Sequence, residues 1–139
     1  MSYIETTASY EKMQENGTVR KVHERYLVDA LTNTEAIATT VERLTPYVSG
    51  DLNVSASKTT KIAEVFNTGD RFYIAKVDIP TVNEKTGAIK HNISQWLVGG
   101  TDFNDAYEMV LREFNESMAA MELVSLAGSP IVEFYPAKL

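Results

Sequence analysis

Apolar and polar residues follow the same order twice along this chain, in two copies offset by 70 residues. In residues 26–36, a stretch typical of a β-strand runs into a stretch with helical spacing of its apolar residues. Residues 96–106 repeat that transition. We therefore interpret the chain as a tandem duplication, with one repeat over residues 1–69 and the other over residues 70–139.

Single residues agree with the same offset. Gly17 falls on Gly87 and Val54 falls on Val124, with no gap in the register. Apolar positions of the expected helices coincide as well: Ala36, Ile37, Val41 and Leu44 match Ala106, Tyr107, Leu111 and Phe114. Glycine on glycine and apolar on apolar is the agreement that a duplicated structural unit requires.

Each repeat is expected to form two strands, a helix, a third strand and a short trailing strand. In the first repeat these are residues 3–12, 18–31, 33–45, 52–56 and 62–66. In the second repeat they are residues 71–79, 88–98, 103–121, 122–127 and 131–135. Residues 15–17 and 83–87 are expected to be turns. Thr32 and Asp102 are expected to cap the helices, with Glu35 completing a capping box.

The connections predict the fold class. Hairpins favour antiparallel pairing, and each helix must bury its apolar stripe against a sheet. We therefore expect an α+β fold, a duplicated strand–strand–helix–strand unit with a largely antiparallel sheet and two helices on one face. Residues 67–70 are too short for a flexible linker, so the repeats are expected to form one compact domain. The other sheet face is then open to a ligand or a second subunit.

Composition narrows the class of protein. The chain has 139 residues, of which 44% are hydrophobic and 23% charged, as is ordinary for a globular protein. It contains no cysteine, which excludes a disulfide scaffold, a thiolate metal site and a cysteine nucleophile. No signal-peptide pattern is found at the N-terminus, and no apolar run approaches the roughly 20 residues of a membrane span. We expect a cytoplasmic protein that does not contact a membrane.

The charge distribution matters more than the net charge of −6, which by itself argues against a generic nucleic-acid binder. Residues 99–122 contain six acidic residues and one arginine, a net charge of −5. Residues 71–98 have a net charge of +2. The acidity is therefore expected on the second helix, as a solvated face, and not on the strands.

Candidate catalytic and metal-binding residues are few. His23 and His91 occupy non-equivalent repeat positions and lack carboxylates at ligand spacing. The pair Gly99-Gly100 precedes a helix, where a phosphate can bind, but the first repeat has Asp29-Ala30 there and no phosphate-binding loop follows. We expect no enzyme activity, no cofactor and no metal site.

A strand surface is the remaining candidate. Alternate residues of the second returning strand share one face: Lys90, Asn92, Ser94 and Trp96. Their repeat partners are Arg20, Val22, Glu24 and Tyr26. A ring and a cation in each repeat suit single-stranded nucleic acid, since bases stack on rings and phosphates approach cations. The expected binding residues are Trp96, Tyr26, Lys90, Arg20, Lys21, Arg71, Lys76 and Asn92. In the alternative interpretation, the two rings pack under a helix or at a dimer interface.

Three motifs carry a resemblance to a known family. They are Tyr-Leu-Val-Asp-Ala followed by Thr-x-x-Glu-Ala, the upstream Glu-Asn-Gly, and the ending Ser-Pro-Ile-Val-Glu-Phe-Tyr-Pro. The chain resembles, over most of its length, short proteins of a domain-of-unknown-function family found in Bacteroidetes and crAss-like bacteriophages. The resemblance implies a role in phage DNA replication or recombination inside a bacterial host cell, because some members are regarded as single-stranded-DNA-binding. It assigns no functional residue.

Together these observations favour a non-enzymatic protein that binds single-stranded DNA and forms homo-oligomers. The alternative is a protein-binding or assembly module that uses an open sheet face.

Overall fold

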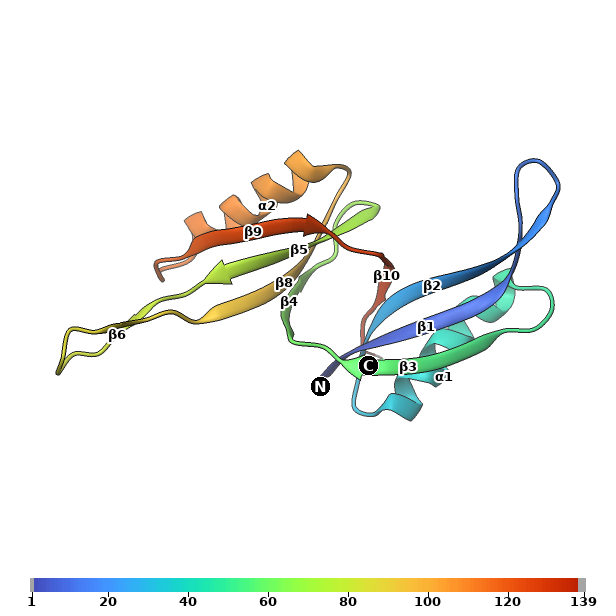
Figure 1. Cartoon of the computed structure of the whole chain (residues 1–139), viewed down its shortest axis with the longest axis horizontal. Helices are drawn as coiled ribbons and strands as arrows, with labels where there is room; N and C mark the ends of the chain where they lie inside the picture. Colours follow the sequence, from blue (N-terminus) through green and yellow to red (C-terminus); the bar gives the residue numbers. More distant parts are fainter. Residues whose placement is uncertain (1, 138–139) are drawn as a thin grey trace. The chain divides into compact units, whose positions relative to one another are not determined.

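The computed structural model describes residues 2–137 and has a mixed α+β fold with mostly antiparallel strands. It divides into two compact units. Unit 1 comprises the chain up to Thr60 together with the chain from Pro130, and unit 2 comprises residues 61–129. Each unit has a four-stranded sheet and one helix, where the sequence predicted a single sheet with two helices (Figure 1).

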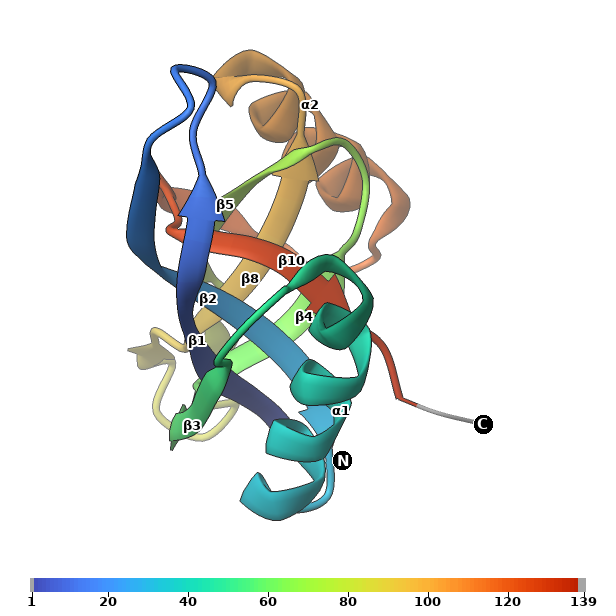
Figure 2. The ribbon, with the colours of Figure 1, turned by 90° about the vertical axis from the view of Figure 1, so that its right-hand side faces the viewer.

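Unit 1 is built around a long hairpin. Its elements are β1 (Ser2–Met13), β2 (Val19–Ala30), α1 (Asn33–Leu44), the 3-10 turn η1 (Thr45–Tyr47), β3 (Asn53–Thr59) and β10 (Ile131–Tyr135). The strand order is β10-β2-β1-β3. The pairs within β1, β2 and β3 are antiparallel, whereas β10 runs parallel to β2. Helix α1 covers one face of this sheet (Figure 2).

Unit 2 repeats that arrangement with a shorter hairpin core. Its elements are β4 (Ile62–Phe66), β5 (Arg71–Asp78), β6 (Thr81–Val82), β7 (Ile89–Lys90), β8 (Ile93–Gly100), α2 (Phe103–Glu116) and β9 (Glu122–Gly128). The strand order β4-β8-β5-β9 is equivalent to that of unit 1, with β4 parallel to β8. Strands β6 and β7 form a separate two-stranded ladder. Within residues 2–137, no helix is both long and apolar enough to cross a bilayer.

The expected turns and helix caps are confirmed. Gly17 and Gly87 have φ angles of 84° and 72°, which glycine adopts without strain, and each lies in a hairpin turn. The Thr32 hydroxyl accepts from the N–H of Glu35 at 3.1 Å, and the Asp102 carboxylate accepts from the N–H of Asp105 at 2.8 Å. Equivalent caps and an equivalent strand order are compatible with a duplication.

The gapless register is wrong in the first and third strands. Thr6 pairs with Tyr26 in unit 1, whereas the residue that pairs with the equivalent Trp96 in unit 2 is Ala75, 69 positions after Thr6. Likewise Ala8 pairs with Val54 and its equivalent Val77 pairs with Leu123, so the offset is 69 residues in both strands and Val54 is not equivalent to Val124. Helix α1 is followed by η1, and α2 by a different connection, so the two helix–strand connections differ in length.

Two elements are shorter than expected because side chains hydrogen-bond to the backbone. Helix α2 ends at Glu116 and not at Met121, since Ser117 is extended and its hydroxyl accepts from the N–H of Ala119 at 3.1 Å. The strand expected over residues 88–98 is interrupted at Asn92. The Asn92 amide donates to the carbonyl oxygen of Ile79 at 3.0 Å, and its own N–H donates to Asp78 at 3.1 Å.

Each core lies between one sheet and its helix. In unit 1, the core residues are Ile4, Ala8, Tyr26, Val28, Ala30, Ala36, Leu44 and Tyr135. In unit 2, they are Tyr73, Ala75, Val77, Trp96, Val98, Ala106 and Val110. The hydroxyl groups of Thr6 and Thr40 form a buried hydrogen bond of 2.8 Å between β1 and α1, so this polar pair is satisfied within the core.

Gly99 lies where the backbone of Thr68 approaches β8 closely. A Cβ built on Gly99 would lie 1.8 Å from the carbonyl oxygen of Thr68, which no real contact allows. The Thr68 hydroxyl also donates to the Gly99 carbonyl oxygen at 3.3 Å. The glycine is therefore required for the segment before β5 to pack against β8.

Replacing Gly99 by alanine should lower the free energy of unfolding by about 1–3 kcal/mol, because the backbone of Thr68 must move to admit the methyl group. Urea denaturation followed by circular dichroism measures the loss. Gly128→Ala is the matched control, since a Cβ at Gly128 meets nothing within 4 Å. Equal stability of the Gly99 and Gly128 variants would contradict the close approach.

Candidate functional site

The two aromatic residues expected to stack on bases are buried. Trp96 is 5% exposed and Tyr26 is 2% exposed, and both point from their strands toward the helix side of the sheet. The Trp96 ring packs edge-on against Phe66 and Phe114, with centroids 5.5 and 5.9 Å apart. The stacking role assigned to these residues is therefore wrong. The strand face that the sequence suggested for binding is the face that packs on the core. The two rings therefore pack under the helices, as in the alternative interpretation.

Tyr26 belongs to a small cluster of phenols around one carboxylate. Its ring stacks on Tyr135 with centroids 5.3 Å apart and an interplanar angle of 9°. The Tyr26 hydroxyl donates to Glu24 at 3.0 Å, and the Tyr10 hydroxyl donates to the same oxygen atom. Burial, followed by the hydrogen bond to Glu24, raises the pKa of Tyr10 to about 12 and raises that of Tyr26 further. Burial and the charge of Glu133 raise the pKa of Tyr135 to about 12.

The remaining expected binding residues do not form one cluster. The side chains of Lys90, Arg20, Lys21, Arg71 and Lys76 are exposed. Arg20 and Lys21 are consecutive on β2 and so point to opposite faces of the sheet of unit 1. The Asn92 amide donates to Ile79 and Thr81, which fixes the break between β7 and β8 and leaves it a structural role.

A polar surface missed by the sequence analysis lies on the sheet of unit 1, on the side away from α1. We call it the open face. Its residues are Glu5, Thr7, Ser9, Glu11, Lys21, His23, Arg25, Asn53 and Ser55. They share this side because they pair across strands and alternate with the buried residues Thr6 and Ala8.

Three basic side chains form a row along the open face. Lys21, His23 and Arg25 occupy alternate positions of β2, so their Cα atoms are roughly 6.8 Å apart. The Nδ1 atom of His23 and the hydroxyl of Ser9 are hydrogen-bonded at 2.7 Å. The guanidinium of Arg25 lies 3.6 Å from the carboxylate of Glu5 and its side chain remains 54% exposed. These residues present donors and positive charge to the solvent.

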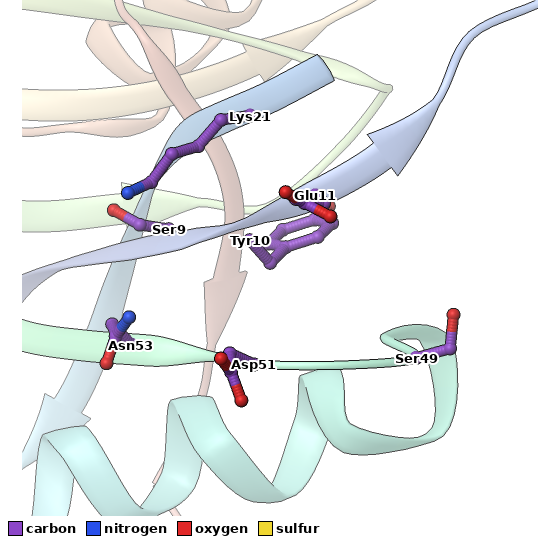
Figure 3. Close-up of a pocket in the computed structure, with 7 residues that line it drawn as sticks. All are labelled: Ser9, Tyr10, Glu11, Lys21, Ser49, Asp51 and Asn53. Atoms are coloured by element: carbon purple, nitrogen blue, oxygen red, sulfur yellow. The ribbon is translucent and has the colours of Figure 1, made fainter. Parts of the chain in front are cut away.

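One end of the open face borders a shallow cavity of about 220 Å³. Its lining residues are Ser9, Tyr10, Glu11, Lys21, Ser49, Asp51 and Asn53. Figure 3 shows the ammonium group of Lys21 beside the hydroxyl of Ser9 on β1, with Asn53 on the neighbouring strand β3. The cavity is polar and mixes a cation with the carboxylates of Glu11 and Asp51.

The hairpin beyond the helix adds an apolar pair. Met13 and Val19 pair directly across the strands and are 71% and 58% exposed. They follow Glu11 and Lys21 on the same side of the hairpin, so they continue the open face. On the opposite side, Lys12 pairs directly with Arg20. Like charges placed opposite each other destabilise a hairpin.

Helix α2 exposes an apolar stripe that the sequence analysis also missed. Phe103, Tyr107 and Leu111 are 53%, 40% and 36% exposed, at positions i, i+4 and i+8 of the helix. The sequence analysis matched Tyr107 and Leu111 to the apolar helix positions Ile37 and Val41, whereas the buried residues of α2 are Ala106 and Val110. Within the described residues, no group of three or more His, Cys, Asp or Glu side chains is arranged to hold a metal ion.

Comparison with known proteins finds one family. A family model described as a domain of unknown function (DUF4494) matches residues 2–137. No curated protein and no solved structure is found to match the chain.

Replacing Trp96 by alanine should lower the free energy of unfolding by about 3–5 kcal/mol, because the indole fills the core between β8 and α2. Urea denaturation of both forms measures the change. Trp96→Phe keeps most of the contact with Phe114 and should be the milder variant. An alanine variant as stable as the parent chain would contradict the buried position of Trp96.

Alkaline pH should destabilise unit 1 through the phenol cluster. A phenol with a pKa raised above its unfolded value of about 10 binds its proton more tightly in the folded state. The resulting stability is present below about pH 10 and is lost as the pH rises toward 12. Absorbance of phenolate against pH measures the titration, and denaturant midpoints between pH 9 and 11 measure the loss. In Tyr10→Phe the loss should be smaller, and an unchanged loss would contradict the role of Tyr10.

Proposed function

Since the chain belongs to the DUF4494 family, whose description specifies no activity, we propose its function from geometry: non-enzymatic binding of a single-stranded nucleic acid through its sugar–phosphate backbone. The site is the open face of unit 1. The observation that carries this proposal is the row of Lys21, His23 and Arg25 on a sheet face that also bears hydroxyl and amide donors.

Those residue types are the ones that contact nucleic-acid backbones. Half to two-thirds of the hydrogen bonds between proteins and DNA go to phosphate and sugar, from Arg, Lys, Ser, Thr and Asn side chains among others. Cores of protein–protein interfaces are instead enriched in aromatic residues and depleted in lysine and serine. The composition of the open face therefore supports a nucleic acid more than a protein as its ligand.

The preference for single strands is proposed to come from the hairpin end. Met13 and Val19 are exposed and continue the open face past Lys21. Unpaired bases can place their flat faces on such apolar side chains, whereas a duplex presents only base edges. This contact replaces the stacking that was expected of the buried Trp96 and Tyr26.

The acidic net charge does not oppose this proposal, because acidity is concentrated elsewhere. Residues 99–122, which contain α2, have a net charge of −5. On the open face, Glu5 is paired with Arg25 and only 13% exposed, and Glu11 lies directly opposite Lys21, so each of these two carboxylates has a cation beside it. Acidity on α2 also limits the nonspecific attraction of the whole chain to duplex DNA.

The biological setting follows from the resemblance of the sequence. We propose a role in phage DNA replication or recombination, in the cytoplasm of a bacterial host. In that setting, single strands occur transiently and must be held without being cut, which is the work of a protein with a backbone-binding face.

A second function has its own observation. The stripe of Phe103, Tyr107 and Leu111 on α2 is flanked by acidic residues, and exposed apolar residues at this spacing serve helix-in-groove recognition. An assembly module would therefore use α2 and not the open face of the sheet.

Fluorescence anisotropy of a labelled oligo-dT should show binding that weakens with salt, and a labelled duplex of the same length should bind less well. Replacing Lys21 by alanine should weaken binding and reduce the slope of log affinity against log salt by about 0.7, the single-strand value for one phosphate. The label is on the oligonucleotide because Trp96 is buried and need not respond to binding.

Arg112→Ala is the matched control, because it removes one exposed cation from the acidic helix α2. It should leave oligo-dT affinity unchanged within error. Equal losses in the Lys21 and Arg112 variants would mean that only net charge matters. Absence of oligo-dT binding at low salt would refute the proposed function.

A further inference from the structure

The fourth strand of each sheet comes from the other half of the chain. Strand β10, at the end of the second repeat, completes the sheet of unit 1 beside β2. Strand β4, at the end of the first repeat, completes the sheet of unit 2 beside β8. We call the edge of β2 at residues 25–28, which pairs with β10, and the edge of β8 at residues 95–98, which pairs with β4, the receiving edges.

The two exchanged strands are alike in sequence and in register. Both have the pattern Ile-x-Glu-apolar-aromatic, Ile62 to Phe66 in β4 and Ile131 to Tyr135 in β10. The isoleucines oppose Gln95 and Arg25, which are equivalent positions of β8 and β2. In both pairs the register shifts between the isoleucine and the glutamate. The receiving edges therefore accept the same kind of strand in the same way.

A repeat cannot place its own trailing strand on its own receiving edge. Strand β3 and the position of the strand that pairs with the receiving edge of β2 lie at opposite edges of the sheet, three strand spacings apart, or about 14 Å. Only Thr60 and Lys61 separate β3 from β4, and the three Cα–Cα steps from residue 59 to 62 span at most about 11 Å. The strand would also run parallel to β3, a connection that needs a dozen or more residues.

Hydrogen bonds fix the first residue of each of these two connections to its own sheet. Thr60 donates from its N–H and its hydroxyl to the carbonyl oxygen of Tyr3, at 2.9 and 2.8 Å. In unit 2, the N–H of Ser129 donates to the carbonyl oxygen of Phe72 at 2.9 Å. Each third strand is thus fixed to its own sheet up to the residue before the exchange. The exchange is a geometric requirement of the repeat.

The exchanged strand is held by specific side-chain contacts. In β10, Tyr135 is 3% exposed, stacks on Tyr26 and lies under the guanidinium of Arg43 at 5.3 Å. The Phe134 ring meets that of Tyr3 edge-on, with centroids 5.9 Å apart. A sheet without its fourth strand would expose these apolar contacts and the unpaired backbone groups of β2. Each receiving edge therefore requires a strand from outside its repeat.

The contacts are the same whether that strand comes from the other half of one chain or from another chain. We propose that the receiving edges bind a second copy of this chain, which inserts β10 beside β2 and forms a strand-exchanged dimer. Within one chain the donor is close by, and at high chain concentration during folding a second chain competes with it. This inference does not depend on nucleic-acid binding, because it uses no residue of the open face as a ligand.

A disulfide trap tests the exchange in a chain that has no cysteine of its own. Arg25 and Ile131 oppose each other in neighbouring strands, at a Cα separation of about 4.8 Å that a disulfide accepts. Full-length Arg25→Cys and Ile131→Cys chains are unfolded, mixed at high concentration, refolded together and oxidised. A covalent dimer on a non-reducing gel is expected, and none is expected when the two chains are mixed after folding.

Two controls make the result decisive. The double variant Arg25→Cys/Ile131→Cys should form the bond within one chain, which establishes that the pair can close. Arg20→Cys replaces the receiving cysteine by one on β2 outside the pairing with β10, and with Ile131→Cys it should give no covalent dimer. A covalent dimer of equal yield from the Arg20 pair, or none from the Arg25 pair while the double variant closes, would overturn the proposal.

The unsubstituted chain provides an independent readout. Equal amounts of labelled and unlabelled chain, refolded together, should give dimers of mixed mass by native mass spectrometry. Substituting β10 by the sequence of β4, through Val132→Ala, Phe134→Val and Tyr135→Phe, should preserve these dimers because the receiving edges are equivalent. Tyr135→Asp should abolish them. Only monomers at every refolding concentration would overturn the exchange between chains.

Discussion

Connector length is the constraint on which the rest of this structure depends. Two residues cannot lead from one edge of a three-stranded sheet to the parallel position on its opposite edge, so each half must complete the other. The aromatic cores follow from this. Tyr26 receives the ring of Tyr135, and Trp96 receives that of Phe66, so both lie where an exchanged strand docks. Tyr26 and Trp96, which the sequence suggested as a ligand-binding pair, are instead contacts between each sheet and the strand that it receives from the other half of the chain.

The open face exists because a single helix covers a single side of the sheet. Helix α1 takes the side that carries Ile4, Thr6 and Ala8, and the other side of the hairpin is polar from Thr7 to Glu11, although Leu27 on that side is fully buried. Polar residues there are free to serve recognition. The equivalent side of unit 2 bears Lys76 together with the exposed Ile93, a mixed surface, so the two halves have diverged in what they present to solvent.

Local features were predictable from the sequence, and long-range ones were not. The α+β class, the turns at Gly17 and Gly87 and the caps at Thr32 and Asp102 follow from side-chain chemistry within a few residues. The side of each strand that faces the helix was taken for the ligand-binding side. The reason is that Lys90 and Arg20 are an even number of residues from Trp96 and Tyr26, yet they are exposed while the two rings are buried. Alternation defines two sides of a strand, and only the packing of the helix decides which one is buried. The exchange of β4 and β10 depends on sheet order, which periodicity does not contain.

The exchange also sets the order in which the protein can be completed during synthesis. The receiving edge of β2 leaves the ribosome about 100 residues before β10 does, and at 5–20 residues per second this takes roughly 5–20 seconds. From residue 59 onward, for about the last 70 residues of that interval, the N-terminal sheet has its hairpin, its helix and its third strand, and it lacks its fourth. Neighbouring ribosomes on one message hold such unfinished chains close together. In the proposed strand-exchanged dimer, this interval is when the edge of β2 is open to the β10 of another chain.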